Sequence, residues 1–235
     1  MTFKIITVLI ASLFLAACVT EGTNIRNPAR SAVPQSPAQI QANQAAGVKN
    51  NSPVLIRIFK SSRELEMWRQ KPNGEYTLVR TFAICTYSGD LGPKKRQGDR
   101  QAPEGFYEVS ARQLNPQSIE WLSFDTGFPN AYDRHHGYTG SALMIHGGCS
   151  SRGCYAVTDS NMEDIYAAMR DAFAGGQKSV QVQIYPFRMH FLNMFFRASG
   201  PHEDFWKQLK VGYDKFEITN RPLDVKVLNG RYQIN

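Results

Sequence analysis

The most informative segment of the sequence is Met144-Ile145-His146-Gly147-Gly148-Cys149-Ser150-Ser151-Arg152-Gly153-Cys154-Tyr155. It begins as an apolar strand that leads His146 into a glycine-rich loop, and the loop presents Cys154 shortly before a predicted helix. The thiolate is the nucleophilic form of cysteine, and a nearby imidazole is a common base that generates it. Flanking glycines allow tight bends, so main-chain N–H groups, including that of Cys154, are natural oxyanion donors. The pattern therefore predicts Cys154 as nucleophile and His146 as general base.

Short strands separated by turn residues surround this segment. They are expected at 54–59, 64–69, 76–85, 106–111, 121–124, 142–145, 180–185 and 225–227. A helix is predicted after Ser160, with Glu163 at capping-box spacing, and a second helical region ends near Lys215. Phenylalanines at helical spacing are expected to pack into the core: Phe187, Phe191, Phe195 and Phe196. The predicted fold class is mainly β with several helices (α+β), in one domain.

The first 18 residues carry an export signal. Lys4 precedes an apolar run that ends near Phe14, and Leu15-Ala16-Ala17-Cys18 resembles the lipobox of bacterial lipoproteins. The alternative is an anchor helix with an incidental cysteine, but the run is shorter than the ~20 residues that span a bilayer. We expect a signal peptide over 1–17 and acyl chains on Cys18 that hold the protein at a membrane. Val19 after Cys18 favours the periplasmic face of an outer membrane.

Residues 18–53 have the composition of a linker. They contain four prolines and many Asn, Gln, Ala and Ser, with no apolar period. Such a segment is expected to be a flexible tether. The predicted catalytic domain then covers 54–235 and includes a helical C-terminal extension.

The chain is basic, with a formal net charge of +7. Removal of 1–17 takes away one charge, that of Lys4, and leaves +6. A basic protein suits nucleic acid, an anionic membrane or an acidic substrate. Export argues against nucleic acid, so anionic lipid or a carboxylate-rich substrate is the expected partner. No cofactor is expected.

The residues around His146 and Cys154 are similar to those of a known family. His146-Gly147 followed by Ser151-Arg152-Gly153-Cys154 resembles the L,D-transpeptidase (YkuD-type) superfamily, and in particular its YafK-like branch. Further matches are Ser88-Gly89, Leu91-Gly92-Pro93-Lys94, 98–105, 129–134 and Phe205-Trp206. The resemblance covers roughly residue 53 to the C-terminus.

The resemblance implies a β-sandwich-like catalytic domain that forms an acyl-enzyme on peptidoglycan. Cys154 would attack a carbonyl beside diaminopimelate in a stem peptide, and His146 would take the thiol proton. The Gly147 carbonyl would orient the imidazole, and Gly153 would belong to the oxyanion loop. The acyl group then passes to an amine or to water, and hydrolysis could release proteins linked to peptidoglycan. The alternative from another class is a non-catalytic, peptidoglycan-binding lipoprotein.

Three further positions are candidate substrate contacts. Arg152 stands where the superfamily usually has a second histidine, and it stays protonated, so it cannot act as a base. It could bind a substrate carboxylate or depress the pKa of Cys154. Tyr132 and Arg134 are expected to contact substrate or to anchor a loop. Lys94-Lys95-Arg96 is either an exposed charge run or a carboxylate-binding border of the cleft.

Cys18 aside, three cysteines remain, so an exported chain should keep one free thiol and could form one disulfide. The resemblance favours a Cys85–Cys149 bridge, although Cys149 could simply be buried. A zinc site on His146, Cys149 and Cys154, completed by His135, His136 or Cys85, is the disfavoured alternative, because its spacing is uncommon. No metal is expected.

Overall fold

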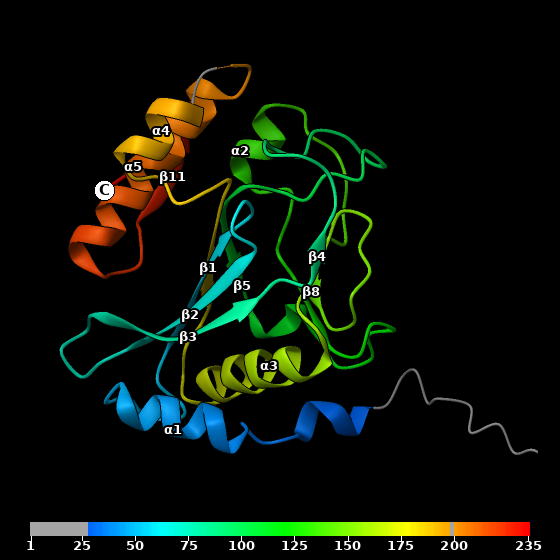
Figure 1. Ribbon diagram of the computed structural model, residues 1–235, viewed down its shortest axis with the longest axis vertical. Helices are drawn as coiled ribbons and strands as arrows, with labels where there is room; N and C mark the ends of the chain where they lie inside the picture. The colour runs from blue at the N-terminus through cyan, green and yellow to red at the C-terminus, as the bar shows by residue number, and fades with distance from the viewer. Residues whose placement is uncertain (1–27, 198–199) are drawn as a thin grey trace, which may run out of the picture.

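The computed structural model describes residues 28–197 and 200–235. The predicted signal peptide, Cys18 and the start of the tether lie outside these residues. Figure 1 shows a central group of strands with the C-terminal helices on one side and α3 and α1 beneath it. Among the described residues, no helix is long and apolar enough to cross a membrane.

The central sheet has five strands in the order β3-β2-β1-β10-β5. Its strands are β1 (Val54–Phe59), β2 (Glu64–Gln70), β3 (Tyr76–Ala83), β5 (Gly105–Val109) and β10 (Val180–Tyr185). β1 pairs in parallel with β10, and the other pairs are antiparallel. Each strand lies close to its predicted range, because turn residues such as those at 72–74 separate the strands clearly.

A second five-stranded sheet carries the site and has the order β4-β9-β8-β7-β6. Its strands are β4 (Thr86–Tyr87), β6 (Leu114–Asn115), β7 (Ser123–Asp125), β8 (Met144–His146) and β9 (Tyr155–Ala156). β8 runs parallel to β9, with Ile145 opposite Tyr155 and His146 opposite Ala156. β7 pairs antiparallel with β8 on its other side.

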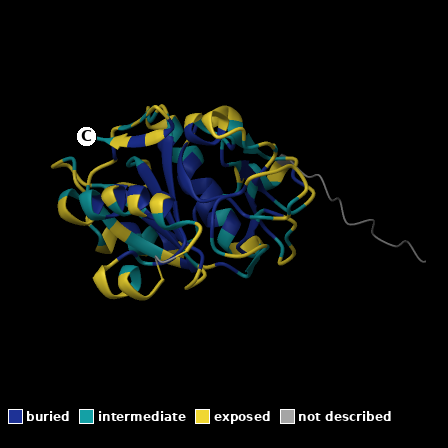
Figure 2. Ribbon diagram, turned by 90° about the horizontal axis from the view of Figure 1, so that it is seen from above, coloured by how far each residue is buried: buried dark blue, intermediate teal, exposed yellow. Residues whose placement is uncertain are grey.

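Helices cover both faces of the central sheet. α3 (Asp159–Ala174) and the second sheet enclose one apolar core, and α5 (Glu203–Thr219) with the hairpin of β11 (Val225–Leu228) and β12 (Arg231–Ile234) encloses another. Every residue of β1 is therefore buried, and Figure 2 shows the buried centre. The α+β class is confirmed, and in the described part of the chain the helices contribute about as many residues as the strands.

The structure differs from the expected tether over residues 28–53. Here η1 (Pro28–Ala32) and α1 (Pro37–Ala45) form a strap along α3. Ser36 caps α1 and also donates from its N–H and hydroxyl to Asp164, each at 2.8 Å. Arg170 of α3 donates to the carbonyls of Ser31 and Val33. The strap docks through hydrogen bonds, so its sequence shows no apolar period.

The C-terminal phenylalanines also differ from expectation. Phe187 is buried, but Phe191, Phe195 and Phe196 lie on α4 (Phe191–Arg197) and are exposed, with Phe195 71% accessible. Helical spacing is confirmed for Phe191, Phe195 and Phe196, whereas Phe187 lies before α4, and α5 rather than α4 packs on the sheet. The predicted helical region is thus two helices, α4 and α5.

Candidate active site

His146 ends strand β8 and is held by the residue that follows it. Its side chain is 5% exposed, and Nδ1 lies 2.6 Å from the Gly147 carbonyl oxygen. A carbonyl can only accept, so Nδ1 carries the proton in this contact, and Nε2 of the neutral ring is left with a lone pair. This is the tautomer that a general base requires.

Cys154 lies on the same face of the sheet as His146 because of the β8–β9 register. Extending the parallel pairing by one residue sets Cys154 next to Met144, and the Met144 N–H donates to the Cys154 Sγ at 3.4 Å. Cys154 is two residues before the partner of His146, so both side chains point to the same face of the sheet. Both also line one cavity of about 680 Å³.

Burial raises the pKa of the Cys154 thiol. The Met144 N–H and the charge of Lys94 act in the opposite direction, while the charges of Asp125 and Glu120 add to the rise. Desolvation is the largest effect, so the neutral thiol is favoured in the free protein. A base is therefore needed to form the thiolate.

The loop before Cys154 bends at a glycine that its conformation requires. Gly153 has φ +113°, a region that side chains with a Cβ rarely adopt. The Cys154 N–H donates to Ser151 Oγ at 3.0 Å, and the Ser151 hydroxyl donates to the Cys154 carbonyl at 2.7 Å. The Cys154 N–H thus has a partner within the loop, contrary to the expectation that it is a free oxyanion donor.

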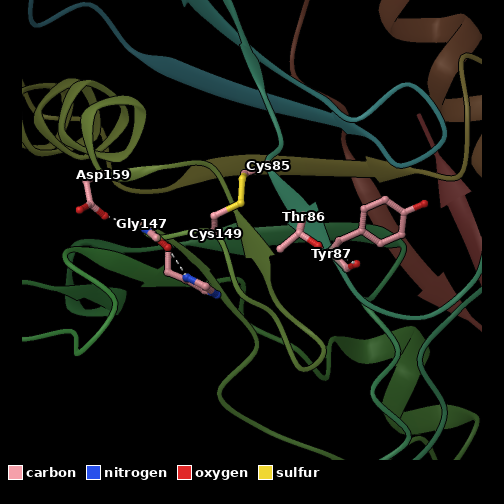
Figure 3. Close-up of a disulfide and its surroundings, with 8 residues drawn as sticks. Cys85, Thr86, Tyr87, Gly147, Cys149 and Asp159 are labelled. Carbon is pink, nitrogen blue, oxygen red and sulfur yellow. Dashed lines mark hydrogen bonds between the residues drawn. A yellow bond between two sulfur atoms is a disulfide. The ribbon is translucent and has the colours of Figure 1, made fainter.

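The loop after His146 is fixed by α3 and by a disulfide (Figure 3). The Gly148 N–H donates to Asp159 Oδ1 at 2.7 Å. Cys149 is bonded to Cys85, with 5.5 Å between the Cα atoms, and Cys154 is the free cysteine of the described residues. A zinc site that uses Cys149 would need its free thiolate, but the sulfur of Cys149 is bonded to that of Cys85.

The start of α3 corrects the predicted capping box. The helix begins at Asp159 with Thr158 as N-cap, and no side chain caps it there. Ser160 lies inside the helix, and Glu163 instead accepts from the Trp121 indole N–H at 2.8 Å. Asp159 bonds to the Gly148 N–H because the loop after β8 returns to this helix end, a contact that local spacing cannot reveal.

The structure brings Arg152 to the site but not Tyr132 or Arg134. Arg152 is exposed, lines the cavity and makes no ion pair with any residue in the described ranges. Tyr132 is 4% exposed and stacks on Tyr232, and Arg134 donates to the Pro129 carbonyl. Neither lines the cavity, because α2 (Ala131–His135) packs beneath the C-terminal hairpin. Of the basic run, Lys94 is buried and paired with Asp99.

The disulfide gives a direct prediction about accessible thiols. Protein lacking residues 1–18, unfolded without reductant, is expected to show one alkylatable thiol, at Cys154, because Cys85 and Cys149 are joined. Peptide mapping after alkylation measures this, and a reduced sample that shows three labelled cysteines is the control. Free alkylation of Cys85 or Cys149 in the unreduced sample would contradict the bridge.

The raised pKa of Cys154 gives a second prediction. A raised thiol pKa favours the neutral form, so alkylation of the folded protein by iodoacetamide should be slow at pH 7. Its rate should keep rising above pH ~8.5, the pKa of an ordinary thiol. The free amino acid derivative N-acetylcysteine is the reference. A rate that levels off below pH 7 would show instead a stable thiolate–imidazolium pair.

The comparisons with known proteins place this site in a family. Residues 53–184 match the family model for the L,D-transpeptidase catalytic domain, YkuD. The chain therefore belongs to the L,D-transpeptidase catalytic domain family. This confirms the family that the segment from His146 to Cys154 indicated.

Two relatives from Escherichia coli agree with this assignment. The chain is 51% identical over 184 residues to "Putative L,D-transpeptidase YafK" of Escherichia coli strain K12, covering 78% of this chain and 74% of that protein. The YafK of Escherichia coli O157:H7 matches with the same values. A crystal structure of the helical cell shape determining protein Pgp2 (K307A mutant) from Campylobacter jejuni is 20% identical, covers 80% of each chain and has a TM-score of 0.47.

Proposed function

We propose that this protein is a cysteine acyltransferase of L,D-transpeptidase type that acts on the diaminopimelate-containing stem peptides of peptidoglycan. Cys154 forms the acyl-enzyme and His146 moves the protons. The observation that carries the proposal is the hydrogen bond of 2.6 Å from His146 Nδ1 to the Gly147 carbonyl, with Cys154 on the same face and in the same cavity. A binding protein would need neither the fixed tautomer nor the thiol.

The proposed step begins with proton transfer from the Cys154 thiol to His146 Nε2. The Gly147 carbonyl holds the opposite nitrogen of the ring and stabilises the imidazolium that forms. The thiolate then attacks the stem-peptide carbonyl, the C–N bond breaks, and the imidazolium gives its proton to the leaving amine. The product is a thioester on Cys154.

The second half-reaction determines the class of enzyme. An amine acceptor makes a new peptide bond, whereas water makes the reaction a hydrolysis that could also release a protein linked to peptidoglycan. In both, His146 acts as base toward the acceptor. Arg152, exposed at the cavity and without an ion-pair partner among the described residues, is suited to a carboxylate of the stem peptide.

We further propose that the protein works in the cell envelope, anchored through a lipid on Cys18 at the periplasmic face of the outer membrane. The lipobox-like Leu15-Ala16-Ala17-Cys18 and the basic charge support this location. Membrane fractionation of a Cys18→Ala protein tests the anchor. A variant that pellets with membranes as fully as the parent would argue against it.

The enzymatic proposal is tested by trapping the acyl-enzyme. The parent protein is incubated with a diaminopimelate-containing tetrapeptide, quenched in acid and weighed by intact mass spectrometry, and the adduct is then mapped. The expected result is one acyl adduct on Cys154, with released products that distinguish an amine acceptor from water. A protein that binds the peptide but never carries an adduct would be a binding protein.

A further inference from the structure

Ser123 carries a buried hydroxyl that has no partner in the protein. Its side chain is 1% exposed, and Oγ makes no hydrogen bond with any residue in 28–197 or 200–235. Buried hydroxyl groups are nearly always hydrogen-bonded, and leaving one unpaired is costly. Ser123 also lines the cavity that contains Cys154 and His146. A polar group kept there without a protein partner indicates a ligand.

The register of β7 and β8 sets Ser123 directly against His146. The two residues are opposite each other in this antiparallel pair. The Gly147 N–H donates to the Leu122 carbonyl at 3.0 Å, so Leu122 and Gly147, the next pair along the strands, are a hydrogen-bonded pair. Ser123 and His146 therefore form a non-hydrogen-bonded pair, in which the Cα atoms are about 4.5 Å apart and the side chains are closest.

The imidazole thus lies between two different groups. In the strand order β9-β8-β7, Cys154 is on one side of His146 and Ser123 is on the other, and all three side chains share one face of the sheet. The Cys154 Sγ contacts the Met144 N–H and, at 3.9 Å, the Ala142 carbonyl, both away from β7. Ser123 is therefore not placed to assist the thiol itself.

We propose that Ser123 Oγ binds the acceptor of the second half-reaction, water or an amine, and holds it against His146. This rests on the proposed function. The acceptor has protons for two partners: one is donated to the lone pair of His146 Nε2 and another to Ser123 Oγ. Its own lone pair is then directed at the thioester carbon. A hydroxyl suits this role because it accepts hydrogen bonds and stays neutral.

The acceptor O or N forms a bond to the thioester carbon while His146 Nε2 takes its proton. The tetrahedral intermediate collapses, the C–S bond breaks, and the Cys154 thiolate leaves with the electron pair. The imidazolium returns the proton to Sγ, and the free enzyme is restored. Ser123 only orients the acceptor and exchanges no proton overall.

The test measures the two half-reactions separately in the full chain. Parent and Ser123→Ala proteins are mixed with the diaminopimelate tetrapeptide, and acyl-enzyme and released product are followed by mass spectrometry. Ser123→Ala should acylate within about twofold of the parent rate. Release should slow about tenfold or more, the scale of one lost hydrogen bond, so that acyl-enzyme accumulates. Its Tm should be unchanged or higher, because no intramolecular hydrogen bond is removed.

A matched pair of variants separates the hydroxyl from the shape of the side chain. Ser123→Thr keeps the hydroxyl and Ser123→Val has nearly the same shape without it, and both suit a strand. Thr should release product faster than Val by a similar factor. Release by Ser123→Ala at the parent rate, or equal slowing of both half-reactions, would overturn the assignment. A parent that never acylates would instead overturn the proposed function and this inference with it.

Discussion

Replacement of Cys154 by alanine is expected to abolish turnover of peptidoglycan. Loss of a catalytic nucleophile typically costs ~10⁴-fold or more in rate. In this chain Cys85 and Cys149 are engaged with each other, so they leave no second thiol beside His146 among the described residues. Digestion of purified sacculi, followed by chromatography of the fragments, measures the loss.

The control for this variant is its stability. The Cys154 Sγ has only weak contacts, with the Met144 N–H at 3.4 Å and the Ala142 carbonyl at 3.9 Å. Cys154→Ala should therefore keep a Tm close to that of the parent, and Ser141→Ala, which removes an exposed hydroxyl just before β8, should keep both Tm and activity. Full activity of Cys154→Ala would show that the sulfur is not the nucleophile and would overturn the proposed mechanism.

The sheet could be predicted from sequence because its strands are bounded by strong turn signals. In β1 the apolar residues predict a strand, but the burial of its second face depends on α5, which lies about 150 residues later. Pairing between β1 and β10 joins residues 126 positions apart, such as Leu55 and Gln181. Local patterns identify which residues form strands, but they do not identify which strands pair with each other.

The apolar pattern does not indicate the strap, for a different physical reason. α1 docks through hydrogen bonds: its N-cap Ser36 donates to Asp164 of α3, and its buried Gln39 accepts from Arg80 of β3. An apolar period is the main signal of a packed helix, and a polar interface lacks it. Ser36-Pro37 was a usable signal, because serine at the N-cap followed by proline is typical of a helix start.

The residues of the candidate site also differ in whether the sequence alone predicts them. His146 ends β8 and Cys154 lies just before β9, at the two ends of one short loop, so their proximity follows from the motif. Ser123 comes to His146 only through the β7–β8 register, and no local motif marks it. Of the two roles expected for Tyr132, substrate contact and loop anchoring, the packing role is found, because a segment shared with a family does not show whether its residues line the cavity or pack α2.

Gly147→Ala is expected to reduce activity about 10²-fold while Cys154 and His146 both remain. A Cβ on Gly147 would lie 2.7 Å from Asp159 Oδ1, 2.7 Å from the Trp121 Cβ and 2.9 Å from the Glu120 carbonyl oxygen. Two of these atoms cannot rotate away, so the backbone at Gly147 must shift. Its carbonyl is the group that orients His146, and a displacement near 1 Å in a catalytic group costs on this scale.

The variant that isolates this effect is Gly98→Ala. Gly98→Ala also adds a Cβ to a glycine, but nothing lies within 4 Å of that Cβ, and the φ of +79° adds only backbone strain. Both variants should lower Tm, whereas only Gly147→Ala should slow acylation of Cys154 in the mass-spectrometric assay. The rate at which iodoacetamide alkylates Cys154 in Gly147→Ala should remain close to that of the parent, since the thiol itself is untouched. If Gly147→Ala acylates at the parent rate, the Gly147 carbonyl does not set the orientation of His146, and the base must be held by other contacts.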